Sequence, residues 1–182
     1  QGAAWREAGV PPAPIAINVS SRQFVDDSFF DDIANALRTS GLPAHLLEIE
    51  LTEGMVMHDI ERAVTLLRAI KQLGVRIAID DFGTGYSSLA QIRRFPIDTL
   101  KVDRSFVRNI QEDHEGQAIT DAIITMAKTL SLTVVAEGVE TAEQLSYLRE
   151  LGCDQYQGYF CSPAVPAPAF EQIVERMRAG RP

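Results

Sequence analysis

The chain has 182 residues, a length that fits one domain of ordinary size. With 46% hydrophobic and 23% charged residues, 12 Gly and 9 Pro, its composition is globular and excludes disordered and collagen-like chains. A formal net charge of -8 argues against binding to duplex nucleic acid, which requires basic surfaces. No run approaches the roughly 18 apolar residues of a membrane span, and no signal-peptide pattern opens the chain. We therefore expect a single domain over residues 1–182, in which residues 1–14 are the tail of a preceding helix and a linker.

Short runs rich in Ile, Val, Leu and Tyr alternate with helical patterns along the chain. The runs predict strands over residues 15–20, 46–52, 76–82, 99–103, 133–138 and 155–161. Apolar residues at helical spacing predict two buried helix faces, one at Ile60, Val64, Leu67 and Ile70 and one at Ile119, Ala122, Ile123, Met126 and Leu130. Thr141 with Gln144 fits a capping box. Strand and helix in repeated alternation predict a parallel sheet with right-handed crossovers.

The two faces of the predicted strands differ in chemistry. One face collects large aliphatic residues: Ile15, Ile17, Leu47, Ile49, Leu51, Ile77, Ile79, Leu100 and Val102. The other face collects small or polar residues: Ala16, Asn18, Glu48, Glu50, Ala78, Asp80, Lys101, Glu137 and Gln157. An open sheet covered by helices on both sides should be apolar on both faces, whereas a barrel directs one face toward its interior and polar mouth. The pattern therefore predicts an α/β fold of the (β/α)₈ TIM-like barrel type.

The chain contains fewer strand–helix units than a complete barrel needs. A (β/α)₈ barrel takes about 250 residues, whereas six units of about 28 residues each are visible in this sequence. Residues 1–8 look like the end of an amphipathic helix with Trp5 as its large apolar residue. We therefore expect an N-terminally truncated barrel of about six units, with the two absent units upstream. Two unpaired sheet edges are expected to favour self-association.

A polar residue of the inward face stands at or near the end of every predicted strand, where barrel active sites lie. These residues are Asn18, Glu50, Asp80, Lys101, Glu137 and Gln157. Carboxylate and amide oxygens suit Mg²⁺ or Mn²⁺, and the lack of His and Cys in the set argues against zinc. The adjacent Asp80 and Asp81 point in different directions and so suit two ions, which can activate a water and neutralise charge on a phosphoryl oxygen. Lys101 adds a compact positive charge for the water or the developing charge. Glu48 shares the face of Glu50, but the pattern assigns it no role.

At these residues the sequence resembles the EAL-domain family, phosphodiesterases that hydrolyse the bacterial messenger cyclic di-GMP. The matching segments are residues 17–20, 50–53, 80–89, 100–103, 135–140 and 157–159. The resemblance implies a barrel that hydrolyses one phosphodiester to give linear pGpG, with Mg²⁺ or Mn²⁺ as cofactors, two ions in all. It also implies a cytoplasmic domain, a homodimer, and upstream sensor or other signalling domains in a full protein that is in some cases membrane-attached.

The resemblance implies a role for each matching residue. The implied metal ligands are Asn18, Glu50, Asp80, Asp81 and Glu137. Lys101 is similar to the family's water-contacting lysine, and Glu137 is similar to a metal ligand or general base. Asp103 and Gln157 match residues near the substrate. Glu53 matches the carboxylate that anchors the glycine loop after Asp81.

One family feature does not occur in the 182 residues, namely the Glu-Ala-Leu motif. In the family this motif lies on a strand before the first one predicted here, its Glu completes the metal site, and an arginine shortly after it helps to hold the substrate phosphate. The resemblance thus covers roughly the last three quarters of the domain. Without that Glu, the chain by itself is predicted to be inactive.

Two other functions stay open at this point. The chain could be a regulatory module that binds cyclic di-GMP or another protein without hydrolysis. From the residues alone, it could also be an enolase-like barrel, in which carboxylates hold Mg²⁺ and a strand lysine abstracts a proton. The adjacent Asp pair fits phosphoryl chemistry better than proton abstraction.

Overall fold

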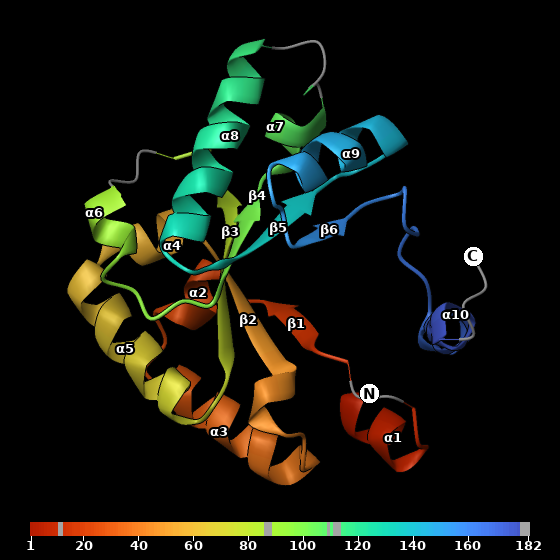
Figure 1. The fold of residues 1–182 in the computed structure, drawn as a ribbon. Coiled ribbons are helices and arrows are strands. Elements are labelled where there is room, and N and C mark those ends of the chain that lie inside the picture. Colours follow the sequence, from red (N-terminus) through yellow and green to blue (C-terminus); the bar gives the residue numbers. More distant parts are fainter. Residues whose placement is uncertain (11–12, 86–88, 109, 111–113, 179–182) are drawn as a thin grey trace.

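Six parallel strands form one sheet in the computed structural model, which describes residues 1–10, 13–85, 89–108, 110 and 114–178 (Figure 1). The strands are β1 (Ile15–Asn18), β2 (Leu47–Thr52), β3 (Arg76–Phe82), β4 (Thr99–Val102), β5 (Thr133–Glu137) and β6 (Gln155–Gln157). They follow one another across the sheet in chain order, which leaves β1 and β6 at its two edges. The predicted α/β half-barrel of six units is therefore confirmed.

Helices connect these strands and cover one face of the sheet, where α3, α5 and α8 lie (Figure 1). The helices among the described residues are α1 (Gly2–Glu7), α2 (Ser21–Phe24), α3 (Phe29–Ser40), α4 (Glu53–His58), α5 (Ile60–Gln72), α6 (Leu89–Ile92), α7 (Arg104–Arg108), α8 (His114–Thr129), α9 (Ala142–Glu150) and α10 (Ala167–Arg178), with a short 3-10 turn, η1 (Ala44–Leu46). Within the described chain, none of these helices is both long and apolar enough to span a membrane. The Trp5 ring of α1 stacks on Phe170 of α10, with ring centroids 5.1 Å apart, so these two helices lie together.

The core lies between the helices and the aliphatic face of the sheet. The predicted aliphatic residues at its centre are fully buried: Ile49, Leu51, Ile77, Ile79, Leu100 and Val102. Each such side chain contributes about 1.5–3 kcal/mol when it leaves water. The two residues of β1 are exceptions: Ile15 is half-buried and Ile17 is 40% exposed, because β1 is an edge strand that lacks a neighbour on one side.

The predicted buried face of α8 is partly wrong. Ile119 is 44% exposed, whereas Thr120 is fully buried along with Ile124 and Ala127. A buried threonine is tolerated here because its hydroxyl donates a hydrogen bond to the Gly116 carbonyl at 2.9 Å. The helix face that meets the sheet is therefore rotated relative to the one suggested by apolar residues alone.

Four predicted strands end earlier than expected, β4 and β5 by one residue and β1 and β6 by two or more. The first ends at Asn18 because Ser20 caps α2, where its hydroxyl accepts a hydrogen bond from the Gln23 N–H. The last ends at Gln157 because the backbone of Gly158 lies against Val139: a Cβ at position 158 would stand 2.2 Å from the Val139 carbonyl oxygen. Residues 86–88 of the segment that resembles the EAL family lie outside the described residues.

Carboxylates tie neighbouring units together at the N-terminal ends of the strands. Asp154, just before β6, accepts hydrogen bonds from the Lys128 Nζ at 2.6 Å and from the Val134 N–H at 2.8 Å. Asp98, just before β4, makes the corresponding contacts with Lys71 and the Ile77 N–H. Contacts at this end of a barrel stabilise the fold, since its chemistry lies at the opposite end.

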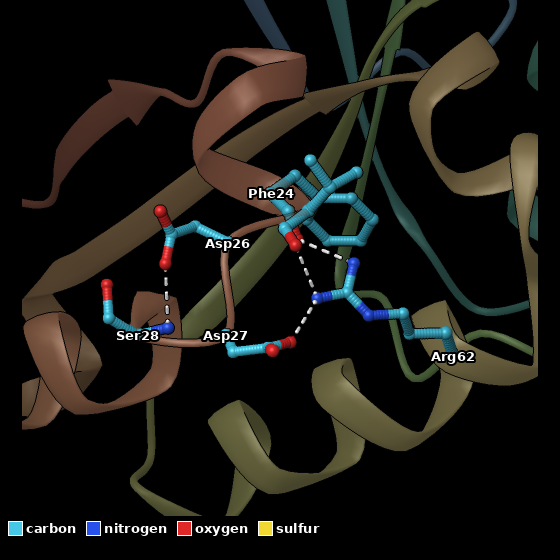
Figure 2. A network of polar contacts seen from close by, with 6 residues as sticks. Phe24, Asp26, Asp27, Ser28 and Arg62 are labelled. Carbon is cyan, nitrogen blue, oxygen red and sulfur yellow. Dashed lines mark hydrogen bonds and ion pairs between the residues drawn. The ribbon is translucent and has the colours of Figure 1, made fainter.

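Arg62, in the first turn of α5, holds α2 in place (Figure 2). Its guanidinium donates to the Val25 carbonyl at 2.7 Å and to the Phe24 carbonyl at 3.5 Å, which satisfies the last carbonyls of α2. It also pairs with Asp27 at 3.1 Å. Because α2 begins shortly after Asn18, this arginine fixes the segment that follows one predicted metal ligand.

Candidate metal and substrate site

Lys101 lies on β4 and is buried, with 4% of its surface exposed. Its Nζ contacts three carboxylates: Glu137 at 2.7 Å, Glu50 at 3.0 Å and Asp80 at 3.0 Å. These come from β5, β2 and β3, so one lysine joins four strands. Three carboxylates facing one ammonium leave two negative charges uncompensated, and one divalent cation would neutralise them. The cluster is therefore electrostatically prepared for a metal ion.

The pKa values of these groups are shifted by burial and by one another. Burial raises the pKa of Glu50 and of Glu137, although the bond to Lys101 acts in the opposite direction. Burial also acts to lower the pKa of Lys101, but its hydrogen bond and attraction to Glu137 and its bond to Glu50 raise that pKa on balance. The lysine therefore stays protonated at neutral pH, and the two glutamates take up protons more readily than exposed ones do.

Asp80, Asp81 and Glu137 present carboxylate oxygens that all lie within 4.8 Å of one another. Asp81 adopts a φ of 53°, a left-handed conformation that is rare outside glycine, and its N–H donates to the Asp80 carboxylate at 3.0 Å. Burial raises the pKa of Asp81, and the nearby Asp80 and Asp103 carboxylates raise it further. An all-oxygen set at this spacing fits Mg²⁺ or Mn²⁺. The donor chemistry is thus compatible with the predicted cofactors.

The other predicted residues flank this cluster. Asn18, exposed at the end of β1, is paired with Glu50 in the strand register, and Gln157 is paired with Glu137 on the other side. A cavity of about 470 Å³ lies beside Glu137. It is lined by Asp81, Asp103, Arg104, Glu137, Gly138, Glu140, Gln157, Gly158 and Tyr159. The strand-end residues are therefore brought together at one end of the sheet, as predicted.

Asp103 lies between β4 and α7, immediately before the first residue of that helix. Its carboxylate accepts a hydrogen bond from the Ser105 N–H at 2.9 Å and another from the Ser105 hydroxyl. Burial acts to raise the pKa of Asp103, but these hydrogen bonds and one from Asp81 lower it on balance. Asp103 is therefore held as a carboxylate at the wall of the cavity.

Glu53 begins α4 and is buried, with 4% of its surface exposed. Its Oε2 accepts a hydrogen bond from the Gly83 N–H at 3.0 Å. A Cβ at Gly85 would lie 2.5 Å from the Glu53 Oε1, so the carboxylate occupies the space that a side chain there would need. Glu53 thus lies against the glycine loop that follows Asp81.

Sequence reasoning left Glu48 unassigned and did not single out Arg104. Glu48 lies closer than Glu50 to the N-terminal end of β2, and its carboxylate accepts a hydrogen bond from the Thr99 hydroxyl at 2.8 Å. It is therefore a satisfied polar group inside the half-barrel. Arg104 lines the cavity, and the one signal in the sequence was its position immediately after the strand-end Asp103.

Carboxylates gathered around a buried lysine, at the C-terminal ends of parallel strands, define a barrel-type site with the chemistry of a metal-dependent enzyme. Residues 1–164 match the EAL domain family, and the chain belongs to this family. It is 45% identical over 171 residues to the cyclic di-GMP phosphodiesterase NbdA of Pseudomonas aeruginosa, an alignment that covers 94% of this chain and 22% of NbdA. The chain spans about a quarter of the length of the curated relatives it matches.

Two solved structures show the same fold. One is the MucR phosphodiesterase in complex with cyclic di-GMP, with a TM-score of 0.89 and 39% identity, covering 92% of this chain and 68% of that one. The other is the manganese and cyclic di-GMP complex of BlrP1 from Klebsiella pneumoniae, with a TM-score of 0.77 and 33% identity, covering 87% of this chain and 41% of that one. The half-barrel is thus an arrangement that this chain shares with EAL structures.

Proposed function

We propose that this domain hydrolyses one phosphodiester of cyclic di-GMP to give linear pGpG in bacterial second-messenger signalling. The observation that carries the proposal is the cluster of Glu50, Asp80 and Glu137 around Lys101, next to a cavity of about 470 Å³. NbdA, which is named a cyclic di-GMP phosphodiesterase, and the MucR complex with that dinucleotide support the choice of substrate. An anionic substrate enters an acidic site only if cations neutralise it, which agrees with a metal-dependent reaction.

Two Mg²⁺ or Mn²⁺ ions are the proposed cofactors. The residues proposed to hold them are Asn18, Glu50, Asp80, Asp81 and Glu137. Their oxygen atoms suit these hard cations, and the BlrP1 complex contains manganese. When bound, such ions lower the pKa of a water molecule and neutralise charge on the phosphoryl oxygens.

The side chains around the ions have separate proposed roles. Lys101, held by three carboxylates and protonated at neutral pH, holds the attacking water by donating a hydrogen bond to it. Glu137 is the proposed general base, because its carboxylate lies at the wall of the cavity, 2.7 Å from the Lys101 Nζ that is proposed to hold the water. Asp103 and Gln157 contact the nucleotide from the cavity wall. Glu53 keeps the glycine loop in place through the Gly83 N–H.

The domain is proposed to act in the cytoplasm, as a homodimer and as one part of a longer signalling protein. The length of its curated relatives, of which it spans about a quarter, supports attachment to further domains such as sensors. The homodimer is proposed from the resemblance to the EAL family. In the 182-residue chain the edges at β1 and β6 also favour self-association, because an unpaired strand favours pairing with another chain.

The test is chromatographic measurement of pGpG formed from cyclic di-GMP with Mg²⁺ or Mn²⁺. It compares the 182-residue chain with a longer version that carries a Glu-Ala-Leu strand. We expect turnover by the longer version and little or none by the shorter one. Glu50→Gln and Asp80→Asn should each abolish turnover, whereas the exposed control Asp31→Asn on α3 should not. Retained activity in Glu50→Gln and Asp80→Asn would refute the metal roles, and binding without turnover in the longer version would favour the regulatory module.

A further inference from the structure

Glu137 is the last residue of β5, so strand pairing fixes its backbone only on the side that precedes it. On the other side the chain enters a sharp turn, residues 138–140, called here the 138–140 turn. Gly138 has a φ of 68°, and a Cβ on it would lie 2.6 Å from the Arg104 Cβ, so the turn packs closely against the start of α7. The place of the Glu137 carboxylate therefore depends on what holds this turn.

The 138–140 turn is held at its middle and at its end. In the middle, the Val139 N–H donates to the Gln157 carbonyl at 3.1 Å. At the end, the buried Gln144 side chain accepts hydrogen bonds at its Oε1 from the Glu140 N–H at 2.7 Å and the Thr141 N–H at 3.0 Å. The capping box predicted for Thr141 and Gln144 is confirmed, and the same oxygen also holds the end of the turn.

The amide nitrogen of Gln144 makes a contact that the start of a helix does not need. Its Nε2 donates to the carbonyl of Arg108, the last residue of α7, at 3.1 Å. A capping box uses only a side-chain oxygen at this position, and glutamate supplies one as well as glutamine does. Because α7 follows the strand of Lys101, the nitrogen links the chain beyond Lys101 to the chain beyond Glu137.

We propose that Gln144 is a positioning residue for the metal site, which holds the 138–140 turn against α7 and so keeps the Glu137 carboxylate in place. The inference rests on the proposed function, in which Glu137 is a metal ligand. The Glu137 carboxylate lies 2.7 Å from the Lys101 Nζ, and it has an oxygen within 4.8 Å of one from each of Asp80 and Asp81. Groups that orient metal ligands change metal affinity about 10–100-fold when they are replaced. Gln144 acts through the backbone, so we expect the lower end of that range.

The test is the apparent dissociation constant of Mn²⁺, measured by isothermal titration calorimetry without dinucleotide on the longer version with the Glu-Ala-Leu strand. Gln144→Met removes the side-chain bonds to the turn and to α7 and should raise the dissociation constant about tenfold. Gln144→Glu keeps the capping oxygen but loses the donor to the Arg108 carbonyl. It should raise the dissociation constant about threefold, within the range of one lost hydrogen bond, although its added negative charge by itself attracts the cation.

The matched control is Tyr147→Phe, on the same helix as Gln144. The Tyr147 hydroxyl donates to the Asp121 carboxylate at 2.6 Å, so this variant also removes a bond between α9 and another helix but leaves the 138–140 turn untouched. It should bind Mn²⁺ as tightly as the wild type. Urea unfolding followed by circular dichroism identifies the variants that are folded under the conditions of the titration. If Gln144→Met does not fold, Gln144→Glu decides.

If the folded Gln144 variants bind Mn²⁺ as tightly as the wild type, Gln144 only caps α9 and the inference is wrong. It is also wrong if Tyr147→Phe weakens binding as much as they do, because metal affinity then follows a general loss of stability. A wild type that binds no Mn²⁺ would overturn the inference together with the proposed cofactors. If the Gln144 variants weaken Mn²⁺ binding but the wild type forms no pGpG, the inference stands and the proposed hydrolysis is wrong.

Discussion

Replacing Lys101 by methionine removes one positive charge from the centre of the site while keeping a side chain of similar length. In the wild-type chain the Lys101 Nζ lies 2.7 to 3.0 Å from three carboxylates, and 4% of the residue surface is exposed. The substitution therefore leaves three partly or fully buried carboxylates facing one another without a counter-charge. We expect the fold to lose stability and the site to become more dependent on metal ions.

The size of the effect follows from the balance between attraction and desolvation. At an effective dielectric constant of about 20, opposite charges about 3 Å apart attract by about 5 kcal/mol, and the cost of burying the lysine offsets much of the sum. Removing one partner of such a buried group costs about 3–5 kcal/mol. We therefore expect Lys101→Met to lower the free energy of unfolding by about that amount near pH 8 without metal.

The loss should depend on pH in a defined direction. Burial already raises the pKa of Glu50 and Glu137, and removing Lys101 takes away the bond that opposes this shift. A carboxylate with a raised pKa in the fold contributes stability that is present below its unfolded pKa and is lost as the pH rises through its folded pKa. The loss of unfolding free energy caused by Lys101→Met should therefore be smaller near pH 5 than near pH 8.

Urea unfolding followed by circular dichroism measures this deficit at both pH values. The control is Lys128→Met, because Lys128 pairs with Asp154 at the surface, where its side chain is 42% exposed. That pair is screened by water, so its loss should cost about 1 kcal/mol or less. If Lys101→Met is as stable as the wild type near pH 8 without metal, or if its deficit does not shrink near pH 5, the description of the cluster is wrong.

Three further predictions concern the fold. Burial acts to raise the pKa of Asp154, but Lys128 and the Val134 N–H lower it on balance. The stability that the Asp154 carboxylate contributes is therefore present above the ordinary pKa of 3.8 and is lost as the pH falls through the folded pKa. Asp154→Asn should therefore cost about 1 kcal/mol or less at neutral pH and nothing in strong acid, and a pH-independent cost in urea unfolding would contradict this. Gly158→Ala puts a Cβ 2.2 Å from the Val139 carbonyl oxygen and should cost about 1–3 kcal/mol, which an unchanged melting temperature would disprove. The 182-residue chain should self-associate through β1 or β6 in analytical ultracentrifugation, and a strictly monomeric, well-folded species would count against this.

Strand alternation predicted the sheet and the position of the site. It placed Ile49 and Ile77 in the core, where both are fully buried, and it placed Glu50 and Lys101 on the opposite face, where they form an ion pair. The reason is physical: in a sheet covered by helices on one face only, burial and charge must separate with a period of two residues. The C-terminal ends of parallel strands meet at one end of the sheet, so the strand-end residues could be grouped from their positions in the sequence.

Features that depend on loops and on long-range contacts were not predictable in this way. The positive φ of Asp81 is a backbone property that residue types alone do not reveal. The hydrogen bond from the Gln144 Nε2 to the Arg108 carbonyl joins segments 36 residues apart. A capping-box pattern contains only local information and does not predict it. Ile119 was misplaced because its apolar side chain fits the helical pattern, whereas the hydrogen bond that allows Thr120 to be buried leaves no trace in hydropathy.

Anomalous diffraction from crystals of the longer version soaked with Mn²⁺ tests the central claim most directly. The account predicts two manganese peaks about 3.5–4 Å apart beside Asp80, Asp81 and Glu137, near Lys101. Manganese bound elsewhere, or bound nowhere while these carboxylates remain paired only with Lys101, would contradict it.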